Sequence, residues 1–169
     1  LKYSVNSLQK LTDMKSFKNM TFLDVGCGCG NQTLEWASRL DTDSTVTGVD
    51  ISEPMLALAE ELKVANQSAL NATVEFVEGD ASEPLFPKET FDAIYSRFGV
   101  MFFADPTAAF TTLLETLKPK GQLGFVCWQS PALNPFFTAP MQAALSVLPP
   151  PPPAKDQPLK AAVASAAIA

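Results

Sequence analysis

The sequence contains no histidine, and only three of its 169 residues are cysteines. Cys27 and Cys29 form a C-x-C pair, but no second cysteine pair and no histidine are present to complete a metal site. Three cysteines also do not make a disulfide framework. We therefore expect no bound metal and a reducing, cytoplasmic location.

Positive charge is scarce as well. The chain carries 12 lysines and arginines against 18 aspartates and glutamates, a formal net charge of -6, and it has no stretch rich in basic residues. Nucleic acid and anionic membrane surfaces are therefore not expected as main partners. The sequence shows no charged-then-apolar leader and no apolar run long enough to cross a bilayer, so we expect no membrane association. Its length suits one domain with a real core.

One stretch, residues 21–31, organises the rest of the chain. A short apolar run with β-branched character stops at Asp24, alternating glycines follow at 26, 28 and 30, and a helical pattern begins near Gln32. This order predicts a strand, a tight loop and a helix N-terminus. Glycines let the loop adopt positive φ and let a ligand approach bare main chain, while the helix start offers unpaired N–H groups. The alternative is a glycine-rich turn that binds nothing.

The glycine spacing separates two kinds of cofactor loop. Dinucleotide-binding loops have the pattern G-x-G-x-x-G, whereas this loop has G-x-G-x-G with an acid two residues before the first glycine. The run Leu23 to Gly30 closely resembles the first motif of class I S-adenosylmethionine-dependent methyltransferases. In that family the loop wraps the methionyl and ribose part of the cofactor. The resemblance implies cofactor contacts by Asp24, Gly26, Cys27, Gly28 and Asn31.

A second predicted strand, residues 45–50, ends at Asp50. A carboxylate at the end of this strand suits a ribose diol, because it offers only acceptors and both hydroxyls donate. The resembling family has its ribose-binding acid here, and the resemblance also places Ile51 at the cofactor. Capping the next helix is the alternative role for Asp50, but Ser52, which precedes Pro54, suits that role better.

A third strand is predicted over 74–80, after a helix over 55–65 and a polar exit over 66–71. In the resembling family the acid that matches Asp80 accepts a hydrogen bond from the adenine amino group, and the backbone of the next residue, Ala81, contacts a ring nitrogen. The alternative is an ordinary turn aspartate after Gly79. Residues 82–90 are predicted to form a loop.

A fourth strand and its exit are predicted over 91–99. In the family this region faces the sulfonium and the acceptor, which implicates Ser96 in the site. Arg97 either steers an anionic acceptor or braces a loop. Asp105 is expected to cap a helix that begins with Pro106. The buried stripe of that helix is predicted to be Ala109, Phe110, Leu113, Leu114 and Leu117.

The end of the sequence predicts a turn over 118–121, where Lys120 stands in place of a family glycine, and a fifth strand over 122–129. Beyond it come a run of prolines at 149–153 and an alanine-rich helix over 159–169. A further amphipathic helix is predicted over 1–18. No partner strand is legible after the fifth, so we expect its bare edge to pair in a homodimer.

Strands alternating with helices predict an α/β, doubly wound, Rossmann-like sheet, mostly parallel, in the order 3-2-1-4-5. The family has two further strands, which this sequence lacks, so the chain is expected to be truncated. We expect an S-adenosylmethionine-binding domain over 1–130 and the start of an acceptor-binding region over 131–169. Ligands bind at the carboxyl ends of such strands.

The expected function is methyl transfer to a small-molecule acceptor by in-line displacement. No catalytic residue is assigned, because without histidine either a carboxylate, Tyr95 or a lysine serves as the base, or the acceptor arrives already nucleophilic. Two alternatives stay open: a cofactor-binding fragment without activity, and an NAD(P)-dependent oxidoreductase, whose loop should have the other glycine spacing.

Overall fold

The computed structural model describes residues 18–130 and 133–148. The chain divides into two units, Leu1–Val126 and Cys127–Ala169. Apart from residue 18, the predicted helix over 1–18 lies outside the described residues, as do the proline run and the predicted helix over 159–169. In the described residues no helix is long and apolar enough to cross a membrane.

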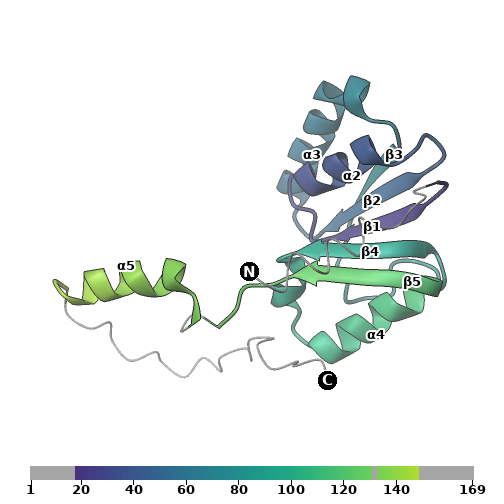
Figure 1. The fold of residues 1–169 in the computed structure, drawn as a ribbon. Coiled ribbons are helices and arrows are strands. Elements are labelled where there is room, and N and C mark those ends of the chain that lie inside the picture. Colours follow the sequence, from purple (N-terminus) through teal and green to yellow (C-terminus); the bar gives the residue numbers. More distant parts are fainter. Residues whose placement is uncertain (1–17, 131–132, 149–169) are drawn as a thin grey trace. The chain divides into compact units, whose positions relative to one another are not determined.

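The first unit is a five-stranded parallel sheet, as predicted (Figure 1). Its strands are β1 (Thr21–Val25), β2 (Thr45–Asp50), β3 (Thr73–Glu78), β4 (Phe91–Arg97) and β5 (Leu117–Val126). The order β3-β2-β1-β4-β5 confirms the doubly wound arrangement. Because all the strands are parallel, the loops that follow them meet at one edge of the sheet, which we call the carboxyl edge.

Helices cover both faces of the sheet (Figure 1). On one face lie α2 (Asn31–Arg39) and α3 (Glu53–Ala65), and on the other lies α4 (Pro106–Thr116). Two short 3₁₀ turns, Gln67–Ala69 and Gly99–Phe102, complete the unit; the second is labelled η2. On the α2 face Trp36 packs on Phe22 and, edge-on, on Tyr95, with ring centroids 4.8 and 5.8 Å apart.

One prediction for the helices is confirmed, one is wrong, and one helix was missed. Asp105 does cap α4, since its carboxylate accepts from the backbone N–H of Ala108 at 3.0 Å. Leu114, however, is 58% exposed, so its predicted burial was wrong. Thr116 fills the buried position instead, and Leu117 already begins β5. Helix α5 (Pro135–Leu145) in the second unit was not predicted at all.

The turn predicted over 118–121 lies within β5. Phe91 of β4 pairs with Leu117, yet Ala93 already pairs with Gln122, so the intervening residues of β5 bulge out of the ladder. Lys120 has a φ of 69° there, which is a turn-like conformation. The prediction of a turn ahead of the strand was therefore wrong, because β5 already begins at Leu117 and contains these residues as a bulge. The strand also ends at Val126, earlier than predicted.

Phe76 of β3 occupies space that two other residues leave empty. A Cβ at Gly30 would lie 2.6 Å from the Phe76 ring, and one at Gly48 would lie 2.8 Å from it. Glycine at both positions therefore makes room for this ring between β2 and the start of α2.

Candidate functional site

Most of the predicted site residues come from the carboxyl edge. Asp24 pairs in register with Gly48 of β2 and with Tyr95 of β4, and Asp50 pairs with Glu78 of β3. Asp50 ends β2, and Ser96 is the next-to-last residue of β4; these two strands flank β1 in the sheet. Asp80 and Ala81 follow β3 after one intervening residue. The parallel topology brings together residues that lie far apart in the sequence.

The glycine loop has the predicted backbone. Gly26, Gly28 and Gly30 have φ values of 68°, 56° and 75°. The backbone N–H groups of Gly26 and Cys27 both donate to Val49 O, at 2.8 and 3.1 Å, which ties the loop to the end of β2. Left-handed backbone of this kind favours glycine at each position.

Gly26 and Gly28 face different surroundings. A Cβ at Gly26 would lie 2.7 Å from the Cα of Gly99, so backbone fills that space. A Cβ at Gly28 would meet only the terminal methyl of Met55, at 2.8 Å. Gly26 is thus required by the protein's own packing, while the loop is open at Gly28 except for one flexible side chain. This openness fits the prediction that a ligand approaches Gly28.

Asp50 holds the loop through its side chain. Its Oδ2 accepts from the backbone N–H of Gly28 at 2.8 Å, and its Oδ1 accepts from that of Ser52 at 3.0 Å. Ser52 occupies the N-cap position of α3 but forms no side-chain cap hydrogen bond, so its predicted capping bond is absent. Asp50 accepts from the N–H of Ser52 itself, just before the first residue of α3. Each carboxylate oxygen keeps lone pairs for further donors, so a diol fits the same group.

Asp24 lies beneath the loop rather than at its surface. Its side chain is 1% exposed, and Thr33 Oγ1 donates to its Oδ2 at 2.7 Å. Burial raises the pKa of this carboxyl from 3.8 to about 6; the Thr33 bond and the charge of Arg97 act against this rise, and the charge of Asp50 adds to it. Thr33 was missed in the sequence, where a threonine in an amphipathic helix gives no signal of this role.

Two groups near Asp24 are held in their protonated forms. Burial raises the pKa of the Cys27 thiol well above its ordinary value, and the charges of Asp24 and Asp50 raise it further. Burial also raises the pKa of Tyr95, with a further contribution from Asp24, although Arg97 acts in the other direction. Neither group is suited to accept a proton or attack as an anion near neutral pH.

The residues after β2 and β3 differ in exposure. Ile51 is 73% exposed, unusual for a large apolar side chain, whereas Ala81 is 8% exposed. Asp80 is exposed, and its Oδ1 accepts from the backbone N–H and the hydroxyl of Ser82, at 2.9 and 2.7 Å. These bonds lower its pKa, the hydroxyl bond most. Asp80 therefore forms the turn suggested as its alternative role, and contact with adenine stays a prediction. Asn31, the first residue of α2, is exposed beside the loop.

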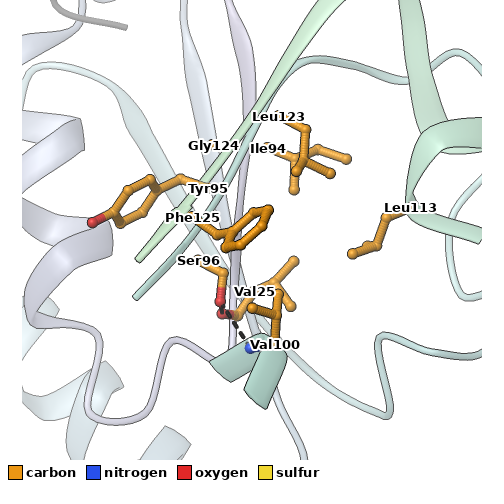
Figure 2. A pocket seen from close by; sticks show the side chains of 9 residues that line it. All are labelled: Val25, Ile94, Tyr95, Ser96, Val100, Leu113, Leu123, Gly124 and Phe125. Atoms are coloured by element: carbon orange, nitrogen blue, oxygen red, sulfur yellow. Dashed lines mark hydrogen bonds between the residues drawn. The ribbon is translucent and has the colours of Figure 1, made fainter. Parts of the chain in front are cut away.

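Ser96 joins three elements at the end of β4. It is buried, donates from Oγ to Val25 O at 2.8 Å and accepts from the backbone N–H of Val100 at 3.2 Å. Figure 2 shows Ser96 and Ile94 on the α4 face of the sheet, with Tyr95 pointing away from them. Apolar side chains fill this region so closely that no ligand-sized space remains. The hydroxyl therefore positions η2 rather than opening a pocket.

No group of three or more histidine, cysteine, aspartate or glutamate residues in the described part of the chain could hold a metal ion. The described cysteines, Cys27, Cys29 and Cys127, are all free thiols.

Residues 23–125 match the family described as Methyltransferase domain, and the chain belongs to this family. Demethylmenaquinone methyltransferase of Staphylococcus aureus (strain MRSA252) is 32% identical over 126 residues, 75% of this chain and 50% of that protein. Phosphoethanolamine N-methyltransferase 3 of Arabidopsis thaliana is 33% identical over 120 residues, 70% of this chain and 23% of that protein. Nocamycin O-methyltransferase of Saccharothrix syringae is 37% identical over 103 residues, 60% of this chain and 35% of that protein. The chain thus spans half or less of the length of these relatives.

Solved structures show the same fold. An S-adenosylmethionine-dependent methyltransferase from Aquifex aeolicus is similar with a TM-score of 0.61 and 26% identity, covering 73% of this chain and 64% of that one. The [4+2]-cyclase SpnF is similar with a TM-score of 0.59 and 28% identity, covering 70% of this chain and 43% of that one. A protein named for a different reaction therefore shares the fold, so the fold alone does not establish methyl transfer.

Proposed function

We propose that this chain is the cofactor-binding part of an S-adenosylmethionine-dependent methyltransferase that acts on a small-molecule acceptor. The observation that carries the proposal is the hydrogen bonding of the Asp50 side chain to the glycine loop. Its carboxylate bonds to Gly28 N and Ser52 N and still offers lone pairs at the carboxyl edge. This acid, the G-x-G-x-G spacing and the membership of the methyltransferase domain family favour S-adenosylmethionine over a dinucleotide.

The described residues fit that cofactor. Asp50 accepts from the ribose hydroxyls, and the open backbone at Gly28, with Cys27 and Asn31 beside it, lies along the methionyl part. Ile51, with its exposed apolar side chain, covers the adenine ring, whose edge Asp80 and the Ala81 backbone contact. Asp24 is buried beneath the loop, so it supports the site without being exposed to solvent. When bound, the cofactor supplies a methyl group already activated by a positive sulfur.

The chain's own contribution is alignment and exclusion of water. Tyr95 and Cys27 stay protonated near neutral pH, so neither serves as a base. An acceptor that arrives as a nucleophile fits these surroundings best. The relatives' names give three dissimilar acceptors, namely a phosphorylated amine, a quinone and nocamycin. A small molecule is the property they share.

Binding of S-adenosylhomocysteine, measured by calorimetry, tests the cofactor. We expect micromolar or weaker affinity without metal, and Asp50→Ala should weaken it by about 1.5–3 kcal/mol, the range for hydrogen bonds to a charged group. Asp43→Ala is the control, because it also removes one carboxylate, an exposed one that lies in the loop between α2 and β2. If Asp50→Ala binds S-adenosylhomocysteine as tightly as the unaltered protein does, Asp50 does not contact the cofactor.

Transfer of labelled methyl tests the activity. Turnover with a phosphorylated amine or a quinone acceptor supports the enzyme, whereas cofactor binding without turnover in any acceptor supports the alternative of an inactive binding fragment. Binding of NADH in place of S-adenosylhomocysteine would favour the oxidoreductase.

We also propose a homodimer and a reducing compartment, such as the cytoplasm. β5 is the last strand of the described sheet and leaves one edge without a described partner. The three free thiols fit a reducing environment. Light scattering that shows a monomer at high concentration would refute the dimer, and thiol titration showing blocked cysteines in natively isolated protein would refute the compartment.

A further inference from the structure

Arg97 is the only basic residue at the carboxyl edge among the described residues. It is the last residue of β4, whereas the other basic side chains occupy strand starts or helix ends at the opposite edge. Helices in such a fold run antiparallel to the strands, so their C-termini return to the amino ends of the strands. The residues at that opposite edge are Lys18, Arg39, Lys63, Lys88, Lys118 and Lys120.

The side chain of Arg97 is exposed, and within residues 18–130 and 133–148 it forms no ion pair or hydrogen bond. Arg39, the other arginine, is instead paired with Glu35 on its own helix. The reading of Arg97 as a brace for a loop therefore finds no support in the described contacts. Its five N–H donors are available to a ligand.

The nearby carboxylates are already occupied. Asp24 is buried and accepts from Thr33, and Asp50 accepts from two backbone N–H groups. The charge of Arg97 nevertheless offsets part of the rise that burial causes in the pKa of Asp24 and of Tyr95. The guanidinium therefore lies near the site without bonding to it. Without this cation the charged side chains described at this edge would all be negative, which disfavours an anion.

The backbone that carries Arg97 is firmly held. Arg97 pairs with Val126 in the β4–β5 ladder, and the next residue, Phe98, donates its N–H to Val126 O at 2.9 Å. Ser96, on the other side, bonds to both β1 and η2. A cation on a fixed strand end binds with less loss of conformational freedom than one on a loose loop.

We propose that Arg97 determines acceptor specificity by binding an anionic group, a phosphate or a carboxylate, on the molecule that receives the methyl group. Guanidinium matches both groups through paired, charge-assisted hydrogen bonds. This inference rests on the proposed function, and it names the acceptor class that the family membership leaves open. The cofactor also carries a carboxylate, so the test must separate the two sources.

The probe is inorganic phosphate, titrated by calorimetry into protein saturated with S-adenosylhomocysteine. We expect millimolar binding by the unaltered protein, at least about tenfold weaker binding by Arg97→Gln, as for the loss of a charge-assisted hydrogen bond, and intermediate binding by Arg97→Lys. Arg39→Gln, which removes the same charge at the opposite edge, should leave phosphate binding unchanged. Equal phosphate binding by Arg97→Gln, or none by the unaltered complex, overturns the proposal.

A second measurement identifies the source of the anion. S-adenosylhomocysteine and methylthioadenosine differ in the amino-acid part that carries the carboxylate. If Arg97→Gln weakens binding of the first and not the second, Arg97 pairs with the cofactor and the assignment to the acceptor is wrong. Unchanged affinity for both supports it. Failure of the unaltered protein to bind S-adenosylhomocysteine at all would instead contradict the proposed function itself.

Discussion

Replacing Asp24 by asparagine should stabilise the cofactor-free protein at high pH. The side chain is 1% exposed, and its pKa is raised from 3.8 to about 6, mainly by burial. Between these pH values the folded state holds the proton and the unfolded state releases it. Ionised Asp24 therefore lowers the free energy of unfolding above pH 6, and this cost disappears below pH 3.8.

The size of the effect follows from the two pKa values. Their difference, at about 1.4 kcal/mol for each pKa unit, corresponds to about 3 kcal/mol at pH 8. Asparagine keeps an oxygen that accepts from Thr33 and has no charge to bury. At pH 4, where the unfolded state is only partly ionised, the gain should fall below about 1 kcal/mol.

Urea unfolding at pH 8 and pH 4 measures both quantities. Asp43→Asn provides the control, since Asp43 is exposed and its replacement should change stability by no more than about 0.5 kcal/mol at either pH. A gain of equal size at both pH values, or a loss at pH 8, would refute the reasoning. If Asp24→Asn is more stable as expected but binds S-adenosylhomocysteine more weakly, the buried charge destabilises the fold while contributing to cofactor binding.

Other substitutions test the loop and its supports. Gly26→Ala should lower the thermal stability, because its Cβ would lie 2.7 Å from the backbone of Gly99. Gly28→Ala, whose Cβ meets only the flexible Met55 methyl at 2.8 Å, should fold but bind cofactor more weakly in calorimetry. Equal thermal stability and equal cofactor affinity in the two variants would contradict this. Ser96→Ala should cost about 1–3 kcal/mol in urea unfolding, because the N–H of Val100 loses its partner. Asp105→Ala should cost about 1 kcal/mol as the loss of a helix cap, and unchanged stability would show that the cap is dispensable.

The sequence predicts the order of elements well where local chemistry and tertiary structure agree. β2 is predicted to the residue, because a run rich in β-branched residues begins after Ser44 and ends at Asp50. The sheet order is also correct, since alternating strands and helices leave few arrangements. The three glycines have the positive φ that their spacing suggests.

The remaining features depend on contacts that no local pattern records. Leu114 has the right spacing for burial, yet its side chain faces solvent because the packed face of α4 runs through Ala109, Leu113 and Thr116. Asp24 and Asp50 look alike in the sequence, as acids at strand ends. Only the structure shows that Asp24 is buried against Thr33, whereas Asp50 is partly buried and accepts a hydrogen bond from the glycine loop. Helix α5 was missed because prolines interrupt its pattern.

The ring of Phe76 restricts which residues two other positions can hold. Since it lies where side chains at Gly30 and Gly48 would otherwise be, neither glycine is free to change while the ring is present. Gly30 is further restricted by its φ of 75°, but Gly48 has no such restriction. A smaller residue at 76 would thus remove one of the two side chains that a Cβ at 48 would meet; the other is Cys27, whose Sγ would lie 2.9 Å away. Gly48→Ala should destabilise the protein less in a Phe76→Leu background than alone, and a double-mutant cycle with no coupling would show the two positions to be independent.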